Sequence, residues 1–437
     1  MMSVKRFVMS SGERFAILID GNNFPMTYPN LYSVIYLRNR GQSINTIVAV
    51  LEDIKLLYLL LDKLEIDIEQ RVKNQNFLKL NEIESVVNLA NFKRHYLLNQ
   101  KSQKKILSFP RALRKEAVRS KFLLKHDDVS KDLVYRRLTN FAEYLGWLES
   151  YFHSSCTTIT NKAFKARRPQ KSIDESMDYK SFDQEQLKIV LNQIDPKGHK
   201  CIWTSEFLNY RNELIIYLFL YLGCRKGELL NIKLSDLVNK KEELKETELS
   251  ESVRKKELKE TELSESVRKK EGTSYITIRR NHDDTSDSRL YQPLVKTRSR
   301  SLALNLNLKK KIDEYILKYR SAIPNAELSD FLILSNQGQP LSINALNKIF
   351  AQISEKVSFN VHAHAFRHTW NDKYTDKSLA LVASGKTTED KAENDRAYLM
   401  GWIPGSQSAR RYSKRAEDRR AMEVGMEIQK RFEEDHG

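Results

Sequence analysis

The chain has 437 residues, of which 40% are hydrophobic, and its 74 Lys and Arg residues outnumber its 57 Asp and Glu residues to give a net charge of +17. The length exceeds that of one ordinary domain and the apolar content excludes wholesale disorder, so we expect two domains plus an extension. A balance this basic favours a polyanionic partner, most often nucleic acid.

Structural metal, disulfides and membrane insertion are all disfavoured. Cys156, Cys201 and Cys224 stand apart, without a CxxC pair or a Cys/His cluster at zinc spacing. The start of the chain lacks the apolar core and cleavage site of a signal peptide. The most apolar run, 214–223, is too short to span a bilayer. These features predict a cytoplasmic protein with no membrane association.

The first part of the chain predicts an extension followed by a small helical domain. Residues 1–40 are expected to be irregular, apart from a strand-like run at 15–19, and they have no assigned role. Ser43 or Asn45 can cap a long helix in which apolar residues recur at helical spacing. Two further stretches have the same periodicity, 81–93 and 131–153. The helical domain with its linker is assigned to 41–170.

A basic segment that contains a proline closes this domain. Residues 165–172 (KARRPQKS) break the helical periodicity, which is typical of a linker. Lys165, Arg167 and Arg168 are candidates for contacts along a phosphate backbone. A solvated loop without a ligand explains the same composition.

The second part, 171–437, predicts a mostly helical domain with one small antiparallel sheet. Helical patterns cover 183–194 and 206–222, and helices resume at Leu308 and Ile343. Two strand-like segments, 274–279 and 301–306, flank a polar, Arg-rich connection. The predicted fold class is therefore mainly α with a small antiparallel sheet.

One insertion is visible within this second part. Residues 243–256 recur without change at 257–270, which indicates a duplicated segment in a loop. A solenoid needs at least three repeats, so this architecture is not expected. We assign the repeat no chemistry, and a partner-binding arm is the alternative.

Three strings carry the chemistry, and the first is LGCRKGELL, which contains Arg225 and Glu228. Attack on a phosphodiester adds negative charge to its non-bridging oxygens. Metal ions held by clustered carboxylates often stabilise that charge, but the sequence has no such carboxylate motif. Guanidinium groups can replace the metal because their planar fork matches phosphate oxygens.

The second string is HAFRHTW, in which His364 and Arg367 lie three residues apart and share a face of a helix. His362 and His368 lie in the wrong register and are interpreted as packing or capping residues. The third string is LMGWIPGSQSARRY, which places Trp402 after a glycine and ends at Tyr412.

The order and content of these strings resemble the tyrosine recombinase (phage integrase) family over about 183–415. The helical block at 41–165 matches the family's core-binding domain only in kind. By this resemblance, Tyr412 is the nucleophile, and Arg225, His364, Arg367 and Trp402 hold the phosphate oxygens. Most members of the family have His where this chain has Trp402, and a core tryptophan is the alternative reading of that residue.

The resemblance also assigns Lys296, in LVKTRSRSLAL, as general acid toward the 5′-hydroxyl leaving group. A surface lysine that clamps a phosphate is the alternative. Glu228 is expected to orient its neighbours. Tyr398 competes with Tyr412 as the nucleophile, but it precedes the Gly-Trp pair and so falls outside the motif. Four further arginines are expected at the DNA surface, namely Arg298, Arg300, Arg410 and Arg411.

The resemblance implies strand breakage and rejoining through a 3′-phosphotyrosine link, with no metal, ATP or other cofactor. It further implies a C-shaped clamp on double-stranded DNA, a nucleoid-associated protein, and a tetramer at two DNA sites with a possible directionality factor. The charged segment 421–437 keeps helical spacing and can dock on a neighbouring protomer or on its own domain. Two alternatives stay open: a silent DNA-binding accessory protein of the same fold, and an enzyme similar to type IB topoisomerases or telomere resolvases.

Overall fold

A computed structural model describes most of the chain. The described residues are 2–99, 128–154, 159–170, 181–198, 201–239, 274–281, 283–405 and 410–436. The chain divides into two compact units, Met1–Glu175 and Ser176–Gly437. Both copies of the repeat at 243–270 lie outside the described residues, as do residues 171 and 172 of the predicted linker. Across the described ranges, every helix is too short or too polar to cross a membrane.

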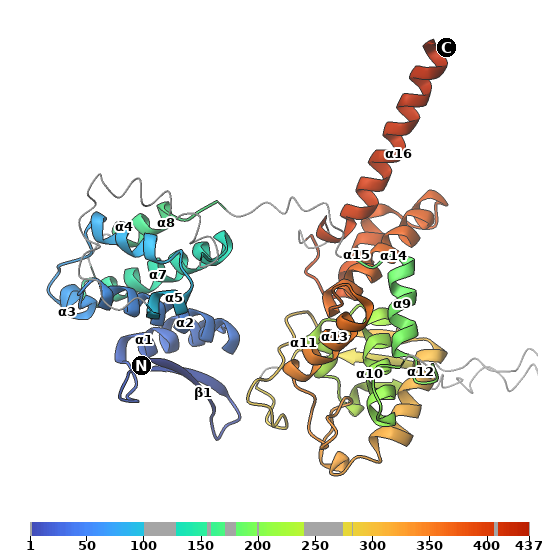
Figure 1. The fold of residues 1–437 in the computed structure, drawn as a ribbon, viewed down its shortest axis with the longest axis horizontal. Helices are drawn as coiled ribbons and strands as arrows, with labels where there is room; N and C mark the ends of the chain where they lie inside the picture. Colours follow the sequence, from blue (N-terminus) through green and yellow to red (C-terminus); the bar gives the residue numbers. More distant parts are fainter. Residues whose placement is uncertain are drawn as a thin grey trace, which may run out of the picture. The chain divides into compact units, whose positions relative to one another are not determined.

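The first unit is helical and carries a β-hairpin at its start (Figure 1). Its described α-helices are α1 (Thr27–Tyr32), α2 (Ile44–Lys63), α3 (Ile68–Lys73), α4 (Leu80–Leu89), α5 (Arg94–Asn99), α7 (Lys131–Phe152) and α8 (Ile159–Ala166). Ser43 caps α2 by accepting a hydrogen bond from the Thr46 amide, so the first of the two predicted caps is confirmed.

The strand-like run predicted at 15–19 is confirmed, but the expectation that the rest of residues 1–40 is irregular is wrong. Strands β1 (Ser3–Val8) and β2 (Arg14–Ile19) pair antiparallel, with Ser3 opposite Ile19, and the hairpin packs against α2. β2 buries Phe15, Leu18 and Ile19. β1 was missed because its burial does not alternate, and a strand at an edge is stabilised by its partner more than by its own apolar pattern.

The core of the first unit lies between α2 and α7, which pack against each other. Apolar side chains of both helices are buried, among them Leu57, Leu61, Phe141 and Leu145. A buried carboxylate, Asp53, accepts two hydrogen bonds from Arg136, at 2.9 and 3.0 Å, and so joins the two helices.

The second unit surrounds a small sheet with helices. The sheet has the antiparallel order β3 (Leu237–Asn239), β4 (Ser274–Ile278), β5 (Arg300–Leu304). The described α-helices are α9 (Gln184–Ile194), α10 (Glu206–Leu222), α11 (Lys226–Leu230), α12 (Leu306–Glu314), α13 (Ile343–Val357), α14 (Ala363–Ala383), α15 (Glu389–Met400) and α16 (Arg410–His436). The predicted fold class, mainly α with small antiparallel sheets, is confirmed.

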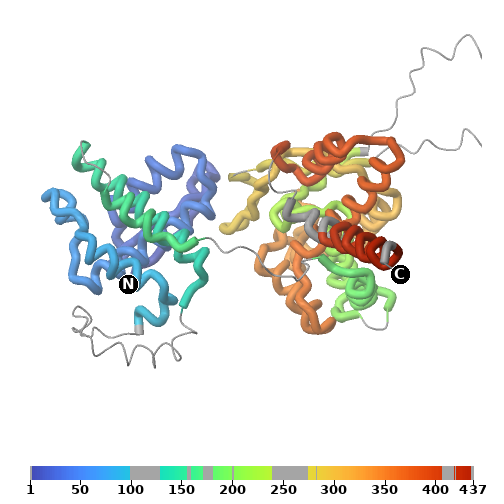
Figure 2. Tube along the Cα trace, turned by 90° about the horizontal axis from the view of Figure 1, so that it is seen from above, coloured from blue at the N-terminus to red at the C-terminus, as the bar shows by residue number. Residues whose placement is uncertain are grey.

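Helix α16 packs on α14 and then projects from the second unit in Figure 1, while Figure 2 views the same helix nearly along its axis. Its apolar residues are more than half exposed at Met422, Val424, Met426 and Phe432. Within this chain, the far part of α16 therefore leaves its apolar side chains uncovered.

Helix ends of the second unit are fixed by two glycines in the left-handed region. Gly223 ends α10 at φ 57°, and Gly401 ends α15 at φ 65°. Glycine adopts this conformation without the Cβ clash that other residues meet. Both ends lie beside Arg367 of α14, because its guanidinium donates to the carbonyls of Gly223 and Met400, at 2.6 and 2.9 Å.

Candidate active site

The carboxylate of Glu228, in the first string, brings residues of the first and second strings together, and the third string lies beside Arg367. Arg225 contributes its main-chain N–H, which donates to Glu228 at 2.8 Å, and its guanidinium lies 3.6 Å from the same carboxylate. Arg367, from the second string, lies 3.9 Å away. The third string reaches the site through Arg367, whose guanidinium carbon lies 5.6 Å from the centre of the Trp402 ring.

Two residues between the strings complete this cluster. Arg300, at the start of β5, forms an ion pair of 3.0 Å with Glu228, and both side chains are buried. The hydroxyl of Thr297 also donates to Glu228. Burial opposes ionisation of Glu228, but Arg300, Arg367 and the Thr297 hydrogen bond outweigh it and hold the pKa of this carboxyl below its ordinary value.

Arg367 is 1% exposed, and in this conformation its guanidinium connects the ends of two helices. Its Nη1 and Nη2 atoms donate to the carbonyls at the ends of α10 and α15. Trp402 is also buried and belongs to a small apolar cluster with Met400 and Ala397. This packing agrees with the alternative reading of Trp402 as a core residue.

Gly401 joins the third string to the loop before β5. Its carbonyl accepts from the Arg298 amide at 3.1 Å. A Cβ at this position would lie 2.6 Å from Arg300 and 2.8 Å from Thr297. Only glycine therefore satisfies both the backbone conformation and the close approach.

Among the predicted catalytic residues whose side chains the structure describes, three reach solvent. The side chain of Arg225 is 33% exposed, while His364 on α14 and Lys296 on the loop before β5 are exposed. Lys296 precedes Thr297 directly, so the Thr297–Glu228 hydrogen bond fixes its main chain beside the cluster. His362, expected to pack or cap, caps α14 by accepting from the Ala365 amide at 3.1 Å.

Tyr412 lies in the first turn of α16, together with Arg410 and Arg411. The side chains of these three residues lie outside what the structure describes. The competing residue, Tyr398, is exposed on α15, and its hydroxyl lies 3.5 Å from the carbonyl of Ser301 on β5.

The residues predicted at the DNA surface take several positions. Lys165, Arg167 and Arg168 lie in or just after α8, so the helix runs into the segment predicted as a linker. Lys165 pairs with Glu143 at 2.6 Å and Arg167 with Glu84 at 2.7 Å, while the Arg168 guanidinium lies 4.7 Å from the ring of Tyr135.

Arg298 is exposed as expected, but Arg300 is not at the surface. Its position on the DNA surface is a wrong prediction, because the side chain is buried against Glu228. The signal was available in β5, where Arg300, Leu302 and Leu304 alternate inward with exposed residues. An inward register buries the arginine, and a buried arginine needs a partner for its charge; for Arg300 that partner is Glu228.

The family comparison covers part of this cluster, namely Thr297, Arg300 and Arg367. A model described as "Phage integrase family" matches residues 246–382, a range that includes Lys296, His364 and Arg367. The resemblance to the phage integrase family is thereby confirmed. Arg225, Trp402 and Tyr412 lie outside the match.

Two likenesses among solved structures concern XerH. A post-cleavage complex of the XerH site-specific recombinase with palindromic difH substrate has 15% identity and a TM-score of 0.45, over 92% of this chain and 94% of that chain. Its pre-cleavage complex with difH has 16% identity and a TM-score of 0.43, over 90% and 93%.

The XerA recombinase has 14% identity and a TM-score of 0.28, over 85% of this chain and 97% of that chain. Among curated proteins, none matches the sequence. The function proposed below therefore rests on the phage integrase match and on the residues around Glu228.

Proposed function

We propose that the protein is a site-specific DNA recombinase that breaks and rejoins strands through a 3′-phosphotyrosine link and moves or resolves a mobile genetic element. The gathering of Arg225, Arg300 and Arg367 around Glu228 supports this proposal. Residues 225, 300 and 367 are far apart in the chain, yet their guanidinium groups gather around one carboxylate. Three positive charges this close together repel one another. Binding of a negatively charged phosphate group explains why the fold brings them together.

In the proposed reaction the Tyr412 oxygen attacks the scissile phosphorus and loses its proton to solvent. The P–O5′ bond breaks, its electron pair stays on the 5′ oxygen, and Lys296 supplies the proton that makes the 5′-hydroxyl. Arg225 and His364 bind the non-bridging oxygens from the exposed side of the site. The bond energy is kept in the phosphotyrosine link, so neither ATP nor metal is required.

Arg367 and Trp402 act from the buried side of the same cluster. Their charge and indole N–H stabilise the transition state, and direct contact with the phosphate requires that Arg367, which is 1% exposed, become accessible to it. Glu228 orients Arg225, because it holds both the main chain and the guanidinium of that residue.

The proposed substrate is double-stranded DNA, which a clamp of two domains holds. Strand exchange takes place in a tetramer, and a directionality factor is a possible further partner. The exposed apolar residues of α16 agree with a docking role for the segment 421–437. Because phosphate contacts release counterions, a protein with several of them loses about 10³–10⁵ in affinity between about 50 and 200 mM salt.

Covalent trapping tests the proposal. Purified protein is incubated in EDTA with a pooled library of nicked duplexes, and adducts that resist SDS and are sensitive to protease are isolated, with Tyr412→Phe beside the wild type. We expect adducts only with the wild type, and sequencing of the trapped DNA gives the site. Adducts that persist in Tyr412→Phe would assign the nucleophile elsewhere, with Tyr398→Phe as the next variant.

The same assay separates the alternatives. DNA binding without an adduct, on a library shown to contain a bound site, favours the silent accessory protein. A topoisomerase-like enzyme should keep relaxing supercoiled DNA when 421–437 is deleted, because that chemistry needs no neighbouring protomer.

A further inference from the structure

The loop that carries Lys296 is anchored immediately before that residue. The Pro293 carbonyl accepts a hydrogen bond from the side-chain amide of Asn231. The main chain of Leu294 lies against Gly227, where a Cβ would be only 2.2 Å from the Leu294 carbonyl oxygen. The approach to Lys296 is therefore fixed on α11 by side-chain and main-chain contacts.

The loop is also anchored on each side of Lys296 itself. Val295 is fully buried in the main core of the second unit, and Thr297 is buried and donates to Glu228. Lys296 is exposed between these two buried neighbours. Its main chain is held while its side chain is left to reach outward.

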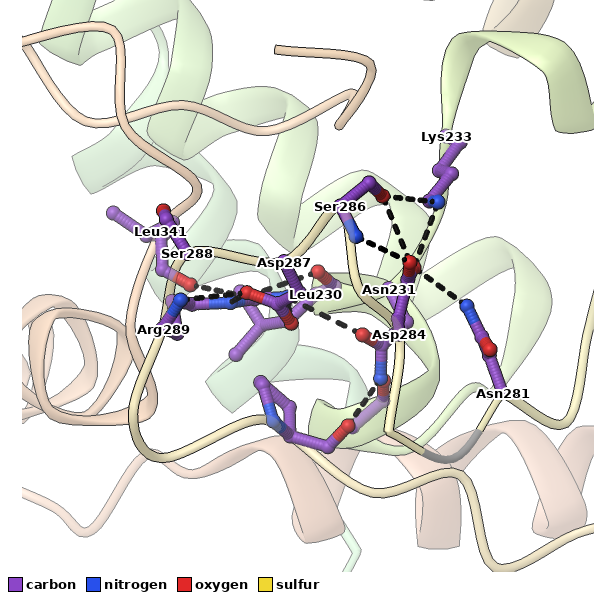
Figure 3. A network of polar contacts seen from close by, with 12 residues as sticks. Leu230, Asn231, Lys233, Asn281, Asp284, Ser286, Asp287, Ser288, Arg289 and Leu341 are labelled. Atoms are coloured by element: carbon purple, nitrogen blue, oxygen red, sulfur yellow. Dashed lines mark hydrogen bonds and ion pairs between the residues drawn. The ribbon is translucent and has the colours of Figure 1, made fainter. Parts of the chain in front are cut away.

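Arg289 holds the upstream part of this loop, because all five of its N–H groups donate hydrogen bonds within the network drawn in Figure 3. Nε and Nη2 donate to the two oxygens of Asp287, both at 2.8 Å. Nη1 donates to the carbonyls of Leu230 and Leu341, at 3.1 and 2.8 Å. The second Nη2 proton goes to Asn231 at 3.2 Å. The Arg289 and Asp287 side chains are 7% and 0% exposed.

Asn231 connects Arg289 by hydrogen bonds to the segment just before Lys296. Its oxygen accepts from Arg289, while its Nδ2 donates to the carbonyls of Gly227, at 2.8 Å, and of Pro293. One connected network thus joins Asp287, Arg289 and Asn231 both to α11, which follows Arg225, and to the loop three residues before Lys296.

Such a restraint matters for a lysine in particular. Its ammonium sits on a flexible four-carbon stem, so the main chain must be fixed if the group is to reach one oxygen reliably. Misplacement of a reacting group by about 1 Å can cost about a hundredfold in rate. Groups that touch substrate are held by supporting hydrogen bonds for this reason.

We propose that Arg289, with Asp287 and Asn231, is a positioning residue that aims Lys296 at the leaving 5′ oxygen. This inference rests on the proposed function, in which the Lys296 ammonium gives its proton to that oxygen as the P–O5′ bond breaks and becomes a neutral amine. Arg289 itself touches neither DNA nor the reacting atoms.

Hydrogen exchange of the protein without DNA tests the restraint. Arg289→Lys keeps the charge but cannot make five hydrogen bonds in a planar fork. We expect faster exchange across 290–298 in this variant. Arg211→Lys is the matched control, because Arg211 is also buried and donates to a carbonyl, that of Leu334, at 3.2 Å. Unchanged exchange across 290–298 in Arg289→Lys would overturn the proposal.

Adduct formation on two substrates tests whether Arg289 positions the Lys296 ammonium at the leaving oxygen. One has the ordinary 5′ oxygen at the scissile bond and the other a 5′ sulfur, which leaves as a thiolate without a proton because thiols have a pKa of about 8.5. General acid catalysis contributes about 10²–10⁴-fold, so we expect Arg289→Lys to lose about tenfold or more on oxygen. The loss in the rate of adduct formation should vanish on the sulfur substrate, both for Arg289→Lys and for Lys296→Ala. The affinity for DNA should not change.

Two failures of this experiment have different meanings. Equal loss on oxygen and sulfur would overturn the positioning of Lys296 and leave the recombinase function intact. A wild-type protein that forms no adduct with either leaving group would overturn the proposed function, and with it the use of Lys296, whatever the exchange shows.

Discussion

Replacement of Glu228 by glutamine should destabilise the second unit strongly, because this carboxylate is the counter-charge for buried arginines. Its side chain is 0% exposed, and two guanidinium groups that are themselves buried lie beside it, those of Arg300 at 3.0 Å and Arg367 at 3.9 Å. Glutamine keeps the shape and an oxygen acceptor but removes the charge. Two buried guanidinium groups then lack their anion.

The size of the effect follows from these distances. At an effective dielectric constant of about 20, unit charges 3.0 and 3.9 Å apart attract by about 5.5 and 4.3 kcal/mol. The desolvation of the carboxylate, which glutamine avoids, offsets several kcal/mol of this attraction. The net cost should lie at about 3–5 kcal/mol, the range for removal of one partner from a buried ion pair. In a unit of this size each kcal/mol lowers the Tm by about 2–4 °C, so a fall of about 6–20 °C is expected.

Thermal unfolding followed by circular dichroism measures this fall, with Glu314→Gln as the matched control. Glu314 pairs with Lys318 at 3.2 Å on the surface, with side chains 40% and 66% exposed, and such pairs contribute about 0–1 kcal/mol. The double variant Glu228→Gln, Arg300→Met should recover part of the loss, because it removes one of the orphaned charges. A Tm for Glu228→Gln as close to wild type as that of Glu314→Gln would refute the reasoning.

Three further predictions follow from the same structure. The pKa of Glu228 is held below its ordinary 4.5, so the ionised carboxylate stabilises the folded protein fully above pH 4.5. This contribution to the free energy of unfolding is lost as the pH falls through the lowered pKa. The difference in Tm between wild type and Glu228→Gln should therefore narrow below pH 4.5. Gly401→Ala should lower the Tm more than Gly385→Ala, since both glycines have positive φ but only Gly401 has Arg300 within reach of a Cβ; equal losses would show that the close approach is unimportant. Burial raises the pKa of Glu149, so ionisation of this carboxyl destabilises the folded wild type as the pH rises past 4.5. Glutamine does not ionise, so the Tm of Glu149→Gln relative to wild type should increase from pH 4 to pH 7. A difference in Tm that stays constant with pH would contradict this.

Elements with a local signal could be predicted from the sequence. The helix after Ser43 has both a capping side chain and helical periodicity, and α7 and α9 follow the same pattern after Ser130 and Asp183, whose side chains cap them. The N-terminal hairpin could not be predicted in this way, because β1 gains its stability from pairing with β2. Pairing is a non-local property that the residues of one strand do not reveal.

For the candidate site, the strings contain Arg225, Glu228 and Arg367, which the fold brings together, and they leave open how each residue is used. The acid three residues after Arg225 was expected to orient its neighbours, and it does contact Arg225. The burial of Arg367 was not foreseen, because it depends on two carbonyls at helix ends that come together only in the fold. Arg300 was misplaced because its charge was considered without its inward register on β5.

The charge balance around Glu228 connects the stability of the site with its proposed chemistry. Three guanidinium groups, of Arg225, Arg300 and Arg367, surround one carboxylate, so the cluster keeps two uncompensated positive charges. A phosphodiester has one negative charge, and the transition state for attack on it approaches two. In the proposed reaction the charge of the cluster therefore matches the transition state better than the bound substrate, and only that difference accelerates a reaction. Without Glu228 the three cations would repel one another before any DNA is bound; with a second acid the excess positive charge would be halved.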